Sequence, residues 1–159
     1  MATTSVTTDQ DVIVAEIQIA APPERVYRAL SDAQELQRWF HGGDECPVKF
    51  WKMEARVGGK YSYETQAGSI EINRVREFKC HGEIVECDPP RLLVYTWIAN
   101  WHDDVSIPTV VRWELTPIQN GTYLKVTHSG LSKMPVARKD YSGGWPGVVS
   151  NLKKFAEAS

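Results

Sequence analysis

The sequence predicts an α+β domain built from an antiparallel sheet of about seven strands, two short helices after the first strand, and a long C-terminal helix. Three observations indicate this fold class. Apolar and polar residues alternate over 12–19, the period of a half-buried strand. Strand-like runs separated by turn residues fill 48–131. Apolar residues recur at helical spacing over 141–156, near the C-terminus.

The first strand and the two short helices follow directly from the pattern over 12–40. Pro22 and Pro23 end the strand, and Pro23 can open a helix that runs through Leu30, because proline is tolerated in a first helical turn. Asp32 is a capping residue for a second short helix, and Glu35 stands three residues after it. The apolar residues of this second helix fall at i, i+3 and i+4: Leu36, Trp39 and Phe40.

The middle of the chain reads as a meander of antiparallel strands. The expected strands are 48–55, 59–65, 78–87, 91–98, 109–117 and 122–129. Glycine, proline and aspartate separate them, and the pair Asn120-Gly121 is a signal for a type I′ hairpin, in which both central residues have positive φ.

The last helix is predicted from an apolar stripe. Its members are Tyr141, Trp145, Val148, Val149, Leu152, Phe155 and Ala156. Proline deep inside a helix loses a backbone hydrogen bond, so we expect the regular helix to start near Gly144 or to bend at Pro146.

Length, composition and charge set the class of protein. A chain of 159 residues suits one domain, expected over 11–159, after a flexible Thr-rich tail over 1–10. The net charge of −2 lacks the basic excess of nucleic-acid-binding proteins, so no nucleic-acid partner is expected. No apolar run approaches the roughly 20 residues of a membrane span, and 1–10 lacks the features of a signal peptide. We therefore expect a cytoplasmic protein without a membrane partner.

The order of these elements is that of the helix-grip fold, in which a curved antiparallel sheet wraps around the last helix. The segment over 19–40, I-A-A-P-P-E-R-V-Y-R-A-L-S-D-A-Q-E-L-Q-R-W-F, resembles the opening of the START-like, Bet v 1-like (SRPBCC) superfamily. Within it, four motifs resemble the activator of Hsp-90 ATPase homologue family. They are A-R-V-G-G-K-Y at 55–61, G-E-I-V-E-C-D-P-P-R-L-L-V-Y-T-W at 82–97, T-H-S-G-L at 127–131 and G-W-P-G-V-V-S-N-L-K-K-F at 144–155.

This resemblance implies a cavity between the sheet and the last helix, where members of the superfamily bind lipids, sterols or polyketides and a few branches catalyse cyclisation. Since fold does not settle function, three hypotheses follow. The first is binding of a small apolar or amphipathic ligand, with no catalytic residue. The second is an interaction protein associated with an Hsp-90-type chaperone. The third is an aromatase-like or cyclase-like enzyme that uses His128 as an acid or base.

Aromatic residues concentrate in the elements that would wall such a cavity. They bury large apolar area and offer N–H or O–H groups that orient a ligand, although plain core packing is the alternative for each. The predicted ligand-binding residues are Trp39, Phe40, Trp51, Met53, Tyr61, Tyr63, Tyr95, Trp97, Trp113, His128, Trp145, Val148 and Val149.

His128 is the polar member of this set. Alternation along the last strand places it on the apolar face with Leu124 and Val126, pointing toward the expected cavity. There it could bind a ligand carbonyl or transfer a proton near neutral pH. A core histidine with satisfied ring nitrogens is the alternative that we favour.

No metal or other cofactor is expected. Cys46, Cys80 and Cys87 lack paired C-x-x-C spacing and read as packing residues with free thiols. Contiguous side chains on a loop, such as those of 102–104, diverge too widely to enclose an ion without other partners. The G-x-S-x-G and phosphate-binding glycine motifs are absent from the sequence.

Overall fold

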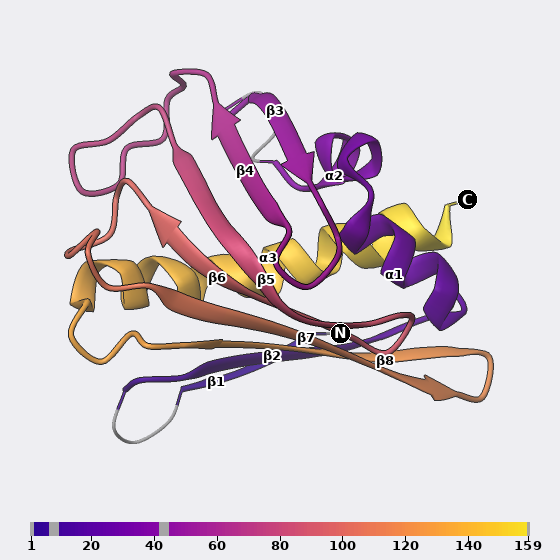
Figure 1. The fold of residues 1–159 in the computed structure, drawn as a ribbon. Helices are drawn as coiled ribbons and strands as arrows, with labels where there is room; N and C mark the ends of the chain where they lie inside the picture. Colours follow the sequence, from indigo (N-terminus) through magenta and orange to yellow (C-terminus); the bar gives the residue numbers. More distant parts are fainter. Residues whose placement is uncertain (1, 7–9, 42–44, 159) are drawn as a thin grey trace.

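The structure, a computed structural model, describes residues 2–6, 10–41 and 45–158. Its strands form one antiparallel sheet in the order β1-β2-β8-β7-β6-β5-β4-β3 (Figure 1). The strands are β1 (Thr3–Val6), β2 (Ile13–Ile19), β3 (Val48–Met53), β4 (Lys60–Thr65), β5 (Lys79–Asp88), β6 (Leu92–Ala99), β7 (Thr109–Ile118) and β8 (Gly121–Ser129). The helices are α1 (Pro23–Ser31), α2 (Ala33–Trp39) and α3 (Pro135–Glu157).

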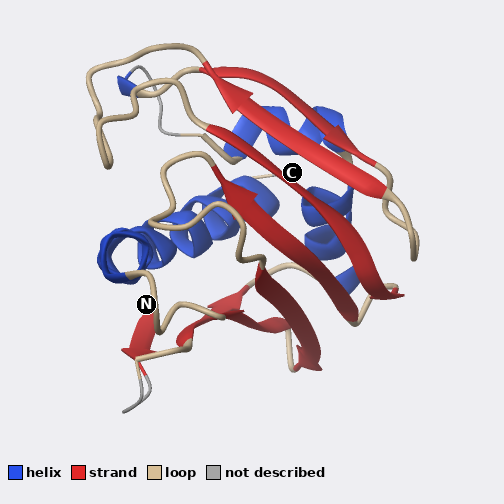
Figure 2. Ribbon diagram, turned by 60° about the vertical axis from the view of Figure 1, so that its left-hand side comes forward, coloured by secondary structure: helices blue, strands red, loops and turns tan. Residues whose placement is uncertain are grey.

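The predicted fold class is confirmed. The sheet curves around α3, which lies on its concave side, while α1 and α2 lie beside the C-terminal part of α3 (Figures 1 and 2). The seven strands expected from the sequence are all present, with ends that differ by at most two residues. None of the helices in the described ranges is long and apolar enough to cross a membrane.

Strand β1, which precedes the strand expected over 12–19, was not predicted. Thr3–Val6 pair with β2 in antiparallel register, from Thr3 opposite Glu16 to Val6 opposite Ile13. The expected flexible tail over 1–10 is therefore wrong for these four residues. All four side chains are exposed, so the strand is held by backbone pairing and leaves no apolar alternation in the sequence. Positions 1 and 7–9 of the expected tail lie outside the described residues.

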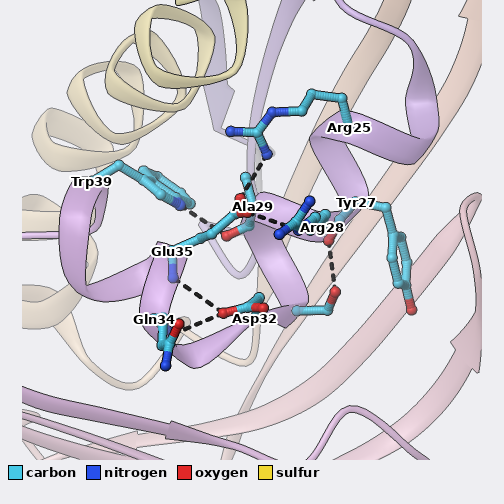
Figure 3. A network of polar contacts seen from close by, with 9 residues as sticks. Arg25, Tyr27, Arg28, Ala29, Asp32, Gln34, Glu35 and Trp39 are labelled. Carbon is cyan, nitrogen blue, oxygen red and sulfur yellow. Dashed lines mark hydrogen bonds and ion pairs between the residues drawn. The ribbon is translucent and has the colours of Figure 1, made fainter. Parts of the chain in front are cut away.

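The two short helices are joined by a polar network (Figure 3). The Asp32 carboxylate caps α2 by accepting hydrogen bonds from the backbone N–H groups of Gln34 and Glu35, at 2.9 and 3.2 Å. The Glu35 carboxylate instead forms ion pairs with two α1 residues, Arg25 at 2.6 Å and Arg28 at 2.9 Å. These contacts fix α2, and Trp39 at its end, against α1.

The long helix begins earlier than the sequence indicates. It starts at Pro135 and continues through Pro146, so the expected start near Gly144 is wrong. The carboxylate of Asp103, in the loop between β6 and β7, accepts hydrogen bonds from the N–H groups of Val136 and Ala137 at 3.2 and 3.0 Å. This cap lies 33 residues away in the chain from Val136, and no local pattern reveals it.

The hairpin between β7 and β8 also differs from its prediction. Ile118 pairs with Gly121, so the central residues are Gln119 and Asn120, one position earlier than expected. Asn120 has a φ of +64°, whereas Gln119 is not left-handed, so the turn is not type I′. A Cβ atom at Gly121 would lie 2.1 Å from the Ile19 carbonyl oxygen, which explains the glycine.

Candidate ligand-binding cavity

A cavity of about 260 Å³ lies between α3, the end of α2, strands β4 and β6, and the segment 66–78. Its size is slightly below the range of roughly 300–1,000 Å³ typical of sites for drug-sized ligands. The described residues that line it are Trp39, Phe40, His41, Cys46, Tyr63, Ile70, Ile72, Phe78, Trp97, Trp101, Asp140, Tyr141, Gly144, Trp145, Val148 and Asn151.

The wall is mainly aromatic: eight of these sixteen residues are Trp, Tyr or Phe. The rings hold one another in place. Phe40 contacts Trp97 and Tyr63, with ring centroids 6.2 and 5.8 Å apart, and Trp101 lies 4.9 Å from Phe78 and 6.1 Å from Tyr141. Interlocked rings have few rotatable bonds, so the wall resists collapse into the cavity.

Tyr141 connects the cavity wall to β6 and to the loop that follows it through its hydroxyl group. The Trp97 indole N–H donates to this oxygen at 2.8 Å, and His102 Nε2 lies 2.6 Å from it. Burial lowers the pKa of His102 to about 4, so its ring is neutral near pH 7. Its Nε2 can therefore accept a hydrogen bond from the Tyr141 hydroxyl group. Tyr141 is thereby held with its ring edge fixed against the cavity.

His128 lies behind this wall and does not line the cavity. The Trp145 indole N–H donates to His128 Nδ1 at 3.1 Å, so the ring proton is on Nε2 and donates to the Thr109 hydroxyl at 2.7 Å. Thr109 in turn donates to the Trp97 carbonyl at 2.6 Å. Burial, with a smaller contribution from His102, lowers the pKa of His128 to about 3. Both nitrogens are satisfied, as in the core-histidine interpretation.

Six of the thirteen predicted binding residues line the cavity: Trp39, Phe40, Tyr63, Trp97, Trp145 and Val148. Their role in binding stays a prediction. The other seven are packed away from it: Trp51, Met53, Tyr61, Tyr95, Trp113, His128 and Val149. Trp51 stacks on Tyr63 at 4.6 Å, and the Trp113 indole donates to the Tyr95 hydroxyl at 2.8 Å, so these rings fill the interior beyond the wall.

Sequence reasoning missed the remaining ten lining residues. Tyr141 was on the predicted apolar stripe of the last helix, and that signal could have identified it. Ile70 and Ile72 lie in a segment without regular periodicity, and Trp101 follows β6 in a turn. Asp140 gave no signal, since a carboxylate on a half-exposed helix position ordinarily faces water.

Among the described lining residues, Asp140 carries the one carboxylate, and none is Lys or Arg. Burial raises the pKa of its carboxyl group to about 6, while the nearby indole of Trp101 lowers it. The Trp101 N–H is buried, and its geometry does not make a standard hydrogen bond to any described residue. An open hollow lies outside the cavity and shares Ile72, Asp140 and Gly144 with it, which places Asp140 at the cavity mouth.

The thiols are free, and the side chains of the loop 102–104 have structural contacts. Cys46, Cys80 and Cys87 are free, and burial raises the pKa of Cys46, the cysteine on the cavity wall. A protonated thiol is a poor nucleophile. Asp103 caps α3, and no group of three potential metal ligands occurs among the described residues.

The model of the family described as activator of Hsp90 ATPase homolog 1-like protein matches residues 20–157. The chain belongs to this family. Its match covers α1, α2, β3 to β8 and α3, and therefore every described residue of the cavity wall. Family membership confirms the resemblance seen in the motifs. A comparison with curated proteins found no match.

Solved structures of bacterial proteins share the fold of this family member. A protein of Rhodobacter sphaeroides is 18% identical, with a TM-score of 0.77, and 99% of this chain and 97% of that chain are covered. A protein of Chromobacterium violaceum is 25% identical, with a TM-score of 0.75 and coverage of 92% and 97%. An AHSA1-like protein from Aeromonas hydrophila is 22% identical, with a TM-score of 0.69 and coverage of 92% of each chain.

Proposed function

We propose that this member of the family binds a small, mainly apolar organic ligand in the cavity between the sheet and α3, without transforming it. The observation that carries the proposal is the open space of about 260 Å³ inside a wall of interlocked aromatic rings. A well-packed interior leaves few voids larger than a water molecule. A mainly apolar space next to a mouth that leads to solvent suits a small organic ligand.

The enzyme hypothesis receives less support from the geometry. Acid or base catalysis requires a group within hydrogen-bond reach of the ligand, with a pKa near the working pH. His128 is fully buried, both of its nitrogens are engaged, and its pKa is depressed to about 3. We therefore assign His128 to the packing behind the wall rather than to catalysis.

Association with an Hsp90-type chaperone is a second candidate function, favoured by the family match over 20–157. It would use the outer surface and is compatible with an occupied cavity. A pull-down of the cell's Hsp90 homologue with this protein as bait tests it. We further propose a cytoplasmic protein with no membrane or nucleic-acid partner, since the charge of −2 offers no basic excess.

Two adjacent valines of α3 give a matched test of the binding proposal. Val148 lines the cavity and is partly exposed, whereas Val149 is fully buried and lies outside the cavity. In Val148→Trp the indole enters the empty space, so we expect loss of ligand binding with little change in melting temperature. In Val149→Trp the indole enters a packed core, and overpacking of this kind costs about 1–3 kcal/mol.

The measurement is the fluorescence of N-phenyl-1-naphthylamine, a neutral dye whose emission rises in apolar surroundings, together with thermal denaturation. The wild type should bind one dye molecule saturably, and Val148→Trp should weaken that binding by at least about tenfold, or 1.4 kcal/mol. Absence of saturable binding to the wild type, or unchanged affinity in Val148→Trp, contradicts the proposal. Equal destabilisation by the two tryptophans would mean that the cavity is not an open space in solution.

A further inference from the structure

The carboxylate of Asp140 lacks the partners that a sheltered acid in this protein otherwise has. Glu35, whose side chain is 11% exposed, forms ion pairs with both Arg25 and Arg28. Asp140 is partly buried at the cavity mouth, yet no Lys or Arg of the described ranges lies within ion-pair distance of it. An ionised carboxylate in such a place is costly unless a cation or several donors face it.

Asp140 lies where the cavity meets the outer hollow. It lines both the aromatic cavity and the outer hollow, so a ligand that enters the cavity from this hollow passes close to its carboxylate. The neighbouring acidic residue in the hollow, Glu71, has its own partner in Arg76 at 3.0 Å. The basic residue there, Lys139, precedes Asp140 on α3 and points away from it around the helix, because successive helical residues do not share a face.

The rest of the wall also suits a positive charge. Trp101, Tyr141 and Trp145 belong to the same wall as Asp140. The faces of aromatic rings carry negative electrostatic potential, and a cation within about 6 Å of a ring centroid is attracted to it, more strongly when water is excluded. An anionic ligand would meet the opposite situation, with a carboxylate at the mouth and no Lys or Arg among the described lining residues.

We infer that the ligand is an organic cation of apolar body, such as an aromatic or alicyclic amine, whose body fills the aromatic cavity and whose protonated nitrogen faces Asp140 at the mouth. This inference rests on the proposed binding function and names the chemical class of its ligand. The Trp101 indole lies near the Asp140 carboxylate, and the amine supplies the positive charge that no described Lys or Arg gives it.

Three naphthalene compounds with one skeleton and different charges separate this inference from simple apolar binding. They are 1-naphthylmethylamine, a cation at pH 7.5, 1-naphthylmethanol, which is neutral, and 1-naphthoate, an anion. Isothermal titration at pH 7.5 should give an amine affinity at least about tenfold higher than that of the alcohol, with the anion weakest.

Asp140→Asn is nearly isosteric and removes the charge, so it should lower the amine affinity to within about threefold of the alcohol affinity, with a much smaller change in the alcohol affinity. The matched control is Glu71→Gln, which removes a negative charge from the outer hollow but should preserve the amine preference. A urea titration of each variant reports on its folding.

The outcomes separate the two proposals. Equal affinity of the wild type for amine and alcohol overturns the cation inference and leaves the binding function standing. An amine preference that survives in Asp140→Asn, or is lost in Glu71→Gln alone, also overturns it, because the charge would then act from elsewhere. Failure of all three compounds to bind the wild type contradicts the binding function itself. The comparison of amine with alcohol in the wild type requires no variant to fold.

Discussion

Replacing Leu152 by alanine is expected to lower the free energy of unfolding by about 2–5 kcal/mol. Leu152 is fully buried on α3, in the stripe that also contains Val149 and Ala156. Helix α3 contacts β2 and α1, so the lost methyl groups leave a gap that the curved sheet cannot easily close. Urea denaturation at pH 7 measures the change.

Two controls separate this effect from a general weakening of the helix. Lys154→Ala, two residues along on the exposed side of α3, should change stability by no more than about 0.5 kcal/mol. Leu152→Met nearly conserves volume and should cost less than about 1.5 kcal/mol. If Leu152→Ala unfolds at the same urea concentration as the wild type, α3 does not pack on the sheet in solution as described.

The second large effect is a loss of stability in acid that arises from His128. Its folded-state pKa is depressed to about 3, whereas the unfolded side chain titrates near 6.5. Above pH 6.5 neither state is protonated and the full stability is present. As the pH falls below 6.5, His128 binds a proton in the unfolded state but not in the folded state, so stability is lost progressively toward pH 3. Between pH 7 and pH 5 the loss is about 2 kcal/mol.

Other groups act in the same range, so the effect of His128 is measured as a difference. The depressed pKa of His102 adds to the acid loss, whereas the raised pKa of Asp140 opposes it between about pH 6 and its unfolded value. His128→Gln should therefore lose about 2 kcal/mol less than the wild type between pH 7 and pH 5 in urea titrations. Equal losses in the two proteins, or an NMR titration of His128 near pH 6.5, would show that its ring is accessible to protons.

The elements that bury one face were predictable from the sequence because burial imposes a period. Seven strands and the two short helices have this period, and the structure confirms them. β1 has four exposed side chains, and its pairing energy comes from the backbone, which every residue shares. The start of α3 depends on Asp103, a cap from a distant loop. Neither feature has a local signature.

The cavity was only partly predictable, for a different reason. Alternation shows which face of a strand points inward, and it correctly placed Tyr63 and Trp97. It cannot show which part of a long concave face stays open and which part is filled by neighbouring side chains. Around Trp113 the space is filled, because the ring of Trp145 packs against it with the ring centroids 5.6 Å apart. Asp140 becomes a site residue only because α3 and the segment 66–78 meet beside it.

The indole N–H signals of the six tryptophans give the most direct test that the cavity binds an apolar ligand. Four of these rings line the cavity, at positions 39, 97, 101 and 145, whereas Trp51 and Trp113 do not. In ¹H–¹⁵N NMR spectra, assigned with single Trp→Phe variants, titration with 1-naphthylmethanol should shift the four cavity signals saturably and leave those of Trp51 and Trp113 nearly unchanged. Saturable shifts confined to Trp51 and Trp113, or no saturable shift at any indole, would contradict ligand binding in this cavity.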